Sequence, residues 1–369
     1  MNEEAFARAL ISCTRPDSQT MREVHQRHGV DVWADLRAGR GSSTVSARAQ
    51  ALDIDDVRRQ LDGLQRINAD FITPEDLRWP TSLDDLPVDQ RPVGLWVRGA
   101  ADIRVASTQA VAIVGSRACT SYGERLALSM AGDLAHKGWT ITSGGAFGID
   151  AAAHRGALAV GGTTVAVLAN GVDVAYPRAH DRLFEDIAAQ GVLVSEVAPG
   201  EPPARFRFLE RNRLIAALSK GTVVIEASTR SGALSTAARA RALGREVMAV
   251  PGPVTSTAST GTHALIRSGA ASLVAHADDV ADLIDVLDPM RTWTREVIDP
   301  RDELDALSRQ LMDALPARGA RSLAFLVNKT GATAAVVQSR LGTLALRELI
   351  ESHAGQWRLT DVGRSSTRR

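Results

Sequence analysis

Two neighbouring apolar runs in the middle of the chain each end in small, hydroxylated or cationic residues. The residues that follow the runs 110–114 and 139–142 are Gly115, Ser116, Arg117, Ser143, Gly144 and Gly145. Where a strand turns into a helix, free backbone N–H groups can bind a phosphate, and successive glycines can form a concave nest of such donors. Neither loop has the Gly-x-Gly-x-x-Gly spacing of a dinucleotide-binding turn. Each loop is therefore either a structural turn or an anion site.

A third segment, 205–213, is rich in arginine and phenylalanine. It contains four arginines, two phenylalanines and one asparagine, and it lies where a loop passes into a helix. The wider region 201–245 has nine basic and three acidic residues. Arginines can neutralise phosphates, and an exposed phenylalanine can stack on an unpaired base. The segment favours a nucleic-acid site over a solvated loop with one phenylalanine in the core. The candidate contacts are Arg205, Phe208, Arg211, Asn212 and Arg213.

A fourth segment follows the apolar run 222–225 and again consists of small and hydroxylated residues. Ser231 and Gly232 stand where a helix is expected to begin, and Arg239 lies further along that helix. These residues either supply more donors to a phosphate or simply cap the helix.

Asp150 and His154 are four residues apart on one face of a predicted helix. Such a pair could act as an acid and a base. The spacing fits better with an aspartate that stabilises the start of the helix and a histidine held by a structural hydrogen bond.

The regular alternation of apolar runs and helical stretches defines the fold that must position these loops. Short β-branched runs alternate with Ala- and Leu-rich stretches over 105–287, which predicts a mostly parallel sheet covered by helices on both faces. We therefore expect an α/β class with an extended doubly wound, Rossmann-like sheet. The apolar runs are 110–114, 139–142, 163–168, 192–194, 222–225, 247–250 and 272–274.

Smaller parts flank this predicted Rossmann-like domain. Residues 1–75 show apolar spacing typical of short helices, at 4–13, 18–28, 32–38 and 53–69. Three helices and a short hairpin near the end suggest a winged helix, a fold that binds DNA in some proteins and docks to proteins in others. The expected parts are a helical domain over 1–75, a connector over 76–104, a linker over 288–301, a winged-helix-like domain over 302–362 and a basic tail over 363–369.

The composition narrows the class of protein. The chain of 369 residues has 44% hydrophobic and 23% charged residues, enough to bury a core in two or three domains. Its formal net charge is zero, so only local charge can indicate a nucleic-acid partner. Two cysteines allow no disulfide framework and no cysteine-based zinc site. An acidic start and the lack of a long apolar run predict a cytoplasmic protein with no membrane partner and no metal or cofactor.

Seven motifs in order resemble those of the DNA processing protein A family, also called DprA or Smf. They are Val114-Gly-Ser-Arg117, Ser143-Gly-x-Ala-x-Gly-Ile-Asp150, Asn170-Gly-x-Asp-x-x-Tyr176-Pro177, Ser195-Glu196, Arg211-Asn-Arg-x-Ile215, Ser231-Gly-x-Leu-x-Thr236 and Pro251-Gly252. The chain departs from the family pattern at Gly145, where leucine is usual, and at His180, where asparagine is usual. Phe-Leu-Glu also stands where Phe-Pro often precedes the Arg-Asn-Arg motif.

The resemblance implies a protein that binds single-stranded DNA and helps to load the RecA recombinase onto it. In naturally transformable bacteria, such proteins protect incoming strands during competence and displace single-strand binding protein. Family members are not known as enzymes. The resemblance further implies an N-terminal helical domain of the SAM type and a C-terminal winged-helix domain.

The resemblance also implies a homodimer. Family members pair through the last helix and strand of the α/β domain, which here places His263, Ile266 and Leu273 at the contact. RecA is expected to dock near the same surface. The alternative is that these three residues pack inside the protein.

Two enzyme classes compete with the binding function. The phosphoribohydrolases that resemble lysine decarboxylases have a related fold and use a catalytic glutamate. When Thr236 is aligned with the threonine of their motif, Arg239 stands in place of that glutamate, which removes the acid–base group. A dinucleotide-dependent oxidoreductase is disfavoured because the glycine fingerprint is missing.

Overall fold

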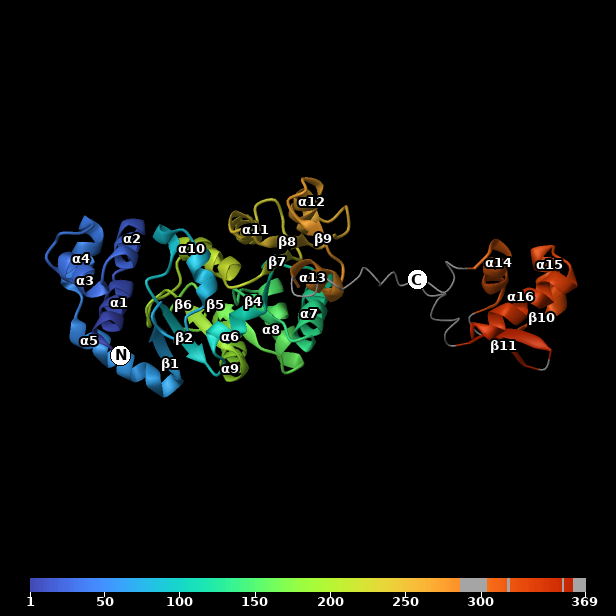
Figure 1. Ribbon diagram of the computed structural model, residues 1–369, viewed down its shortest axis with the longest axis horizontal. Coiled ribbons are helices and arrows are strands. Elements are labelled where there is room, and N and C mark those ends of the chain that lie inside the picture. The colour runs from blue at the N-terminus through green and yellow to red at the C-terminus, as the bar shows by residue number, and fades with distance from the viewer. Residues whose placement is uncertain (286–303, 317–318, 354, 361–369) are drawn as a thin grey trace. The chain divides into compact units, whose positions relative to one another are not determined.

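The computed structural model describes residues 1–285, 304–316, 319–353 and 355–360. The chain forms two compact units, Met1–Val286 and Leu287–Arg369 (Figure 1). Among the described residues, no helix combines the length and the apolar character that a membrane span requires.

A nine-stranded sheet forms the centre of the first unit, with the strand order β1-β2-β6-β5-β4-β3-β7-β8-β9. Neighbouring strands are parallel from β6 to β9, and β2 is antiparallel to both β6 and β1. Each of the seven apolar runs forms one of the strands β3 to β9, so the predicted α/β class is confirmed. The strands are β1 (Ala69–Ile72), β2 (Leu95–Gly99), β3 (Ala110–Val114), β4 (Thr140–Ser143), β5 (Thr164–Val167), β6 (Val192–Ser195), β7 (Gly221–Val224), β8 (Glu246–Ala249) and β9 (Ser272–Leu273).

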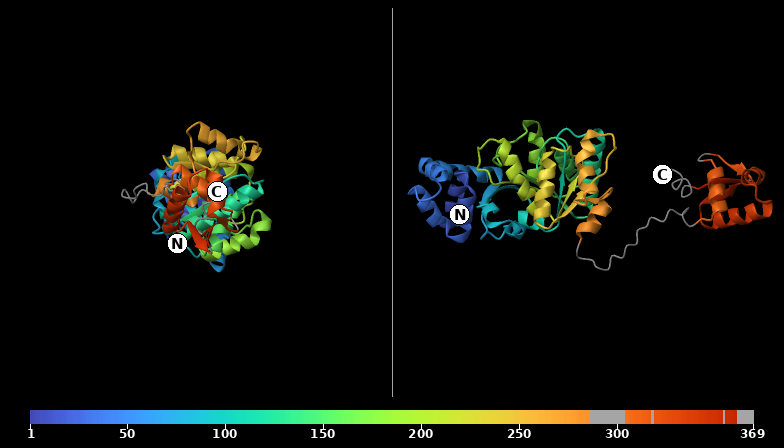
Figure 2. Two further views of the ribbon diagram at one scale, coloured as in Figure 1. Left: turned by 90° about the vertical axis from the view of Figure 1, so that its right-hand side faces the viewer. Right: turned by 90° about the horizontal axis from the view of Figure 1, so that it is seen from above.

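Helices cover both faces of the sheet (Figures 1 and 2). Alternate side chains of β3 enter different cores: Val111 and Ile113 pack with α7, α8 and α13, whereas Ala112 and Val114 pack with α6, α10 and α11. Burial on both faces explains why the strands are continuously apolar. The helices are α6 (Ile103–Thr108), α7 (Ser121–His136), α8 (Ile149–Ala159), α9 (Asp181–Gln190), α10 (Arg205–Ala217), α11 (Gly232–Ala242), α12 (Thr260–Arg267) and α13 (Ala277–Ile284).

The winding direction of the sheet reverses between β3 and β7. These strands are neighbours in the sheet, although three strands separate them in the sequence. From this point β4, β5 and β6 extend to one side, and β8 and β9 extend to the other. Open α/β sheets bind their ligands outside the carboxyl ends of the strands at such a reversal. The loops after β3, β4 and β7 therefore lie where a ligand site is expected.

The N-terminal helices lie at one end of the sheet, next to β1 and β2 (Figure 2). They are α1 (Glu3–Cys13), α2 (Ser18–Gln26), α3 (Gly29–Arg37), α4 (Ser43–Ala51) and α5 (Ile54–Leu64). The sequence analysis did not identify α4, whose apolar stripe consists mainly of Val45 and Ala49. The helix expected over 53–69 ends at Leu64, because the chain passes from there into β1.

The region 76–104, expected to be a connector, belongs in large part to the core of the first unit. Trp79, Leu83 and Leu86 are buried, and Leu95–Gly99 forms β2 between β1 and β6. Proline-rich sequence favoured a connector, but its apolar residues fill the space beside the sheet. Short 3-10 turns occur at Gln65–Ile67, Thr81–Asp85, Val88–Gln90, Arg178–His180 and Thr257–Ser259.

The second unit has three helices and a three-stranded sheet of order β10-β12-β11. Its core includes Leu311, Leu326 and Leu341, and a positive φ of 73° at Gly355 allows the turn between β11 and β12. The helices and hairpin follow the order predicted for a winged helix. The linker at 288–301 and the tail at 363–369 lie outside the described residues. The elements are α14 (Ala306–Ala314), β10 (Arg321–Ser322), α15 (Leu323–Thr330), α16 (Ala334–Leu346), β11 (Ile350–His353) and β12 (Gln356–Leu359).

Candidate nucleic-acid interface

An arginine and two aromatic rings meet at the carboxyl ends of the parallel strands. Arg117, exposed on the loop after β3, places its guanidinium carbon 4.6 Å from the centre of the Phe208 ring. Phe208 lies in the first turn of α10, with its ring centre 5.9 Å from that of Tyr176. A small pocket of about 50 Å³ opens here, lined also by Gly144 and Phe147. We call this the aromatic pocket.

The loops after β3 and β4 are held firmly against each other beneath this pocket. The N–H of Ile149 donates to the carbonyl of Ser116 at 3.2 Å, and the N–H of Ser116 donates to the carbonyl of Glu226 at 2.7 Å. Gly148 has a φ of 76°, and a side chain there would collide with the Ser116 backbone. Gly115 likewise leaves no room for a side chain, because Ile149 packs against it.

Asp150 and Arg211 hold the Gly144-Gly145 loop from inside. The Asp150 carboxylate accepts hydrogen bonds from the N–H groups of Gly144 at 3.2 Å and Ala146 at 3.4 Å. Burial raises the pKa of Asp150, and the nearby Arg211 guanidinium opposes that rise. Arg211 donates to the carbonyl of Val167 at 2.7 Å, and its guanidinium occupies the space that a side chain at residue 144 would need.

Burial lowers the pKa of Arg211 to about 10, which leaves the guanidinium charged at neutral pH. The side chain is only 6% exposed and was predicted to contact phosphate. In the structure it supports the loop from below. The loop residue Ser143 is also buried and donates from its hydroxyl to the Ile113 carbonyl at 2.6 Å.

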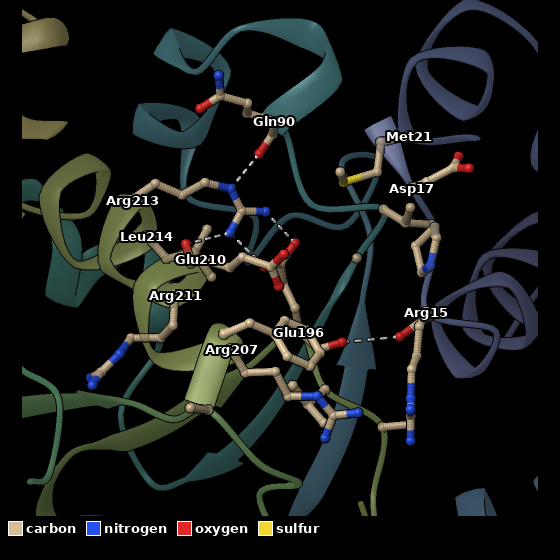
Figure 3. Close-up of a pocket in the computed structure, with 18 of the residues that line it drawn as sticks. Arg15, Asp17, Met21, Gln90, Glu196, Arg207, Glu210, Arg211, Arg213 and Leu214 are labelled. Carbon is tan, nitrogen blue, oxygen red and sulfur yellow. Dashed lines mark hydrogen bonds and ion pairs between the residues drawn. The ribbon is translucent and has the colours of Figure 1, made fainter. Parts of the chain in front are cut away.

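The next two predicted contacts on α10 also point into the protein. Arg213 forms an ion pair of 2.6 Å with Glu196 and donates from Nε to the carbonyl of Gln90 at 2.8 Å (Figure 3). Asn212 donates to the carbonyl of Gly232 at 3.3 Å, which ties α10 to α11. Figure 3 shows Arg211 extending away from the Arg213–Glu196 pair. These side chains fix α10 in place.

The remaining predicted contacts are dispersed. Arg205 is the first residue of α10 and is exposed. Ser231 caps α11, because its hydroxyl accepts from the N–H of Ala233 at 3.3 Å, and Gly232 is the first residue of that helix. Arg239 is exposed and donates to the side-chain oxygen of Gln90 at 3.1 Å. Of the predicted residues, Arg117, Gly144 and Phe208 share the aromatic pocket.

Two aromatic residues of the pocket were not among the predicted contacts. Tyr176 is 44% exposed and Phe147 is 48% exposed. Tyr176 belongs to the Tyr-Pro motif of the resemblance, and Phe147 stands inside the Ser143–Asp150 motif. An aromatic residue in a loop motif was the available signal. The sequence could not show that these rings converge on Phe208.

A buried carboxylate occupies the start of α7 at the reversal point of the sheet. Glu226, at the end of β7, is 1% exposed and accepts from the N–H and the hydroxyl of Thr120, at 2.8 and 2.6 Å. Gly123 has no Cβ because Glu226 fills that space. A helix start is the usual place for a nucleotide phosphate. A carboxylate there repels phosphate, which agrees with the missing dinucleotide fingerprint.

The pair Asp150 and His154 is structural, as the sequence favoured. His154 is fully buried, and its Nδ1 lies 2.7 Å from the hydroxyl of Thr164. Burial lowers the pKa of His154 to about 3, so the ring is neutral at neutral pH. Because Asp150 binds the Gly144 loop instead, the pair does not act as an acid and a base.

The three predicted dimer residues lie at the far edge of the sheet. Leu273 is 55% exposed on the edge strand β9, and Ile266 is half-buried on α12. The Nε2 atom of His263 lies 3.0 Å from the carbonyl oxygen of Gly252. An exposed leucine on an edge strand leaves this surface available to a partner.

The fold and the pocket define a Rossmann-like protein that presents a cation and aromatic rings at the strand ends instead of a dinucleotide-binding turn. Residues 70–285 match the family model of the DNA recombination-mediator protein A, and the chain belongs to this family. Its members are DNA-binding recombination mediators.

Curated relatives and solved structures agree with this assignment. The chain is 43% identical over 365 residues to a candidate DNA processing protein DprA of Mycobacterium tuberculosis, covering 96% of this chain and 90% of the relative. The crystal structure of DNA processing protein A from Streptococcus pneumoniae superposes with a TM-score of 0.67 at 33% identity, covering 77% of this chain and 99% of that one. DNA processing protein A from Helicobacter pylori, solved to explain its single-stranded DNA binding mode, superposes with a TM-score of 0.52 at 29% identity, covering 57% and 94%.

Proposed function

We propose that this protein binds single-stranded DNA at the aromatic pocket and helps to load a RecA-type recombinase onto the strand. The observation that carries the proposal is the stack of Arg117 on Phe208, beside Tyr176, at the carboxyl ends of the strands. Family membership and the relative from Helicobacter pylori, whose single-stranded DNA binding was studied structurally, support the same ligand.

The chemistry of the pocket suits an unpaired strand. Every base has a flat face that can stack on Phe208 or Tyr176, and a guanidinium can bind phosphate. A cavity of about 50 Å³ is too small to enclose a nucleotide, so bases would lie on the rings at the surface. Binding of this kind tolerates many sequences, as a protein that coats DNA strands requires.

The experiment that tests the proposal is a titration with labelled oligo(dT), run beside an assay for nucleoside monophosphate cleavage on the same preparation. We expect tight, salt-dependent binding and no cleavage. The second result follows from Arg239, which supplies a cation where the related hydrolases have their glutamate. Cleavage without oligo(dT) binding would overturn the proposal in favour of the enzyme.

Recombinase loading has its own test. We expect the protein to speed the assembly of RecA on single strands already coated with single-strand binding protein. A variant that cannot bind oligo(dT), such as one lacking Arg117 and Phe208, serves as the matched control. Equal assembly rates with and without the protein would remove RecA loading and leave DNA binding in place.

The proposed homodimer uses the edge formed by α12 and β9. A charge placed at Ile266 would face an apolar partner surface and favour monomers. We expect light scattering to give the dimer mass for the natural chain and the monomer mass for a folded Ile266→Glu variant. Arg59→Ala, on α5 and far along the chain, is the control. A dimer mass for Ile266→Glu would exclude this patch as the contact.

A further inference from the structure

A second, larger cavity lies between the N-terminal helices and α10 (Figure 3). Its volume of about 660 Å³ falls within the range of about 300–1,000 Å³ that is usual for ligand sites. Arg15 and Asp17, from the loop between α1 and α2, face Arg207 and Glu210 of α10 across it (Figure 3). We call this cavity the interdomain cleft.

The interdomain cleft adjoins the aromatic pocket. Leu168 and Ala169, which follow β5, line both cavities. Phe208 lines the aromatic pocket, and Phe206, which is 53% exposed, lines the cleft. Residues two apart on a helix project about 200° apart. Helix α10 therefore presents one aromatic ring to each cavity, with the exposed Arg205 at its start.

Two arginines in the cleft have only neutral partners. Arg48, exposed on α4, donates to the carbonyls of Thr14 and Arg15 at 3.3 and 3.4 Å, and Arg239 donates to the amide oxygen of Gln90. Their charges are free to attract phosphate. The other arginines that line the cleft are paired or supported from within: Arg15 and Arg207 with Glu201, Arg213 with Glu196, and Arg211 beneath the Gly144 loop.

The carboxylates of the cleft are mostly neutralised. Glu196 and Glu201 are in those ion pairs, and Asp17 caps α2 by accepting from the N–H of Thr20 at 2.9 Å. Glu210 projects from the exposed side of α10, and partial burial raises its pKa. Its charge is the one that would oppose a phosphate in the cleft.

We propose that a single DNA strand bound at the aromatic pocket continues over α10 into the interdomain cleft, where a base stacks on Phe206 and a phosphate meets Arg48. The inference rests on the proposed function and extends it: the N-terminal helices form part of the DNA-binding surface. Short strands reach only the aromatic pocket, whereas longer strands gain affinity from the cleft.

The test compares oligo(dT) of about 4 and about 16 nucleotides, the limits of site size for related single-strand binding surfaces. We expect Phe206→Ala to weaken binding of the longer strand by about 5- to 150-fold, the loss of one stacked base, and to leave the shorter strand unchanged. Arg48→Ala should reduce the salt slope of the longer strand by about 0.7.

Glu210→Gln gives the opposite sign, because removal of a repelling charge should tighten binding of the longer strand only. A variant that merely disturbed the fold would not improve binding. Arg59→Ala, an exposed arginine of α5 that does not line the cleft, is the control and should match the natural chain. Thermal unfolding of each variant confirms that it is folded.

Two results would overturn the inference. If Phe206→Ala, Arg48→Ala and Glu210→Gln all bind the longer strand as the natural chain does, the strand does not enter the cleft. If Phe206→Ala weakens both lengths equally, Phe206 belongs to the aromatic pocket. In either case Phe208→Ala still tests the proposed function, which fails on its own only if that variant binds both lengths normally.

Discussion

The first and second halves of the segment 205–213 have similar composition and opposite surroundings. In the first half, Arg205 and Phe206 are exposed and Phe208 lies under Arg117. In the second half, Arg211 and Arg213 are each 6% exposed and bound to protein oxygens. The difference follows from geometry, because the first turn of α10 projects beyond the strand ends and later turns pack on the sheet. Arginine density alone therefore does not identify a phosphate contact.

The largest expected effect is on the stability of the buried half. Arg211→Ala would leave the Asp150 carboxylate buried without its cation, which costs about 3–5 kcal/mol of unfolding free energy. Urea denaturation measures this loss, with Arg205→Ala as the exposed control. If Arg211→Ala unfolds like the natural chain and loses only DNA affinity, the two halves are equivalent after all.

A smaller loss of stability is expected at the next buried arginine. Arg213→Ala removes the ion pair with Glu196 and the bond to the Gln90 carbonyl, and hydrogen bonds to charged groups contribute about 1.5–3 kcal/mol. A double-mutant cycle with Glu196→Gln isolates the pair. Strictly additive losses would show that the two side chains do not interact.

The exposed half should affect binding rather than folding. Phe208→Ala is expected to lose about 1–3 kcal/mol of oligo(dT) binding while its urea midpoint changes little, because the ring stacks at the surface. Fluorescence anisotropy and urea denaturation on the same preparation measure both. A midpoint far below that of the natural chain would make Phe208 a core residue and shift the stacking role to Tyr176 or Phe206.

The smallest effect is expected at the exposed arginine of the pocket. Arg117→Ala should reduce the slope of log affinity against log salt by about 0.7, the value for one phosphate contact with a single strand. Arg213→Lys, which keeps a buried charge, is expected to leave the slope unchanged. An unchanged slope for Arg117→Ala would remove phosphate from this face of the sheet.

Local sequence was sufficient for the elements whose residues carry their own pattern. The β-branched runs predicted β3 to β9, because strands buried on both faces must be apolar throughout. It did not reveal β1 and β2 as members of the sheet. Their pairing depends on β6, a strand nearly a hundred residues further along the chain, and no local pattern reports such a partner.

The sequence alone determined the α/β class, the loops at the carboxyl ends of the strands and the residue types that suit a nucleic acid. Tertiary structure alone decided which cations face outward. Arg211 and Arg117 are both arginines in family motifs, but one is held beneath a glycine loop and the other lies on an aromatic ring. The physical reason is that burial depends on what packs against a side chain, and for Arg211 this is Val167 and Gly144, which are distant in the sequence.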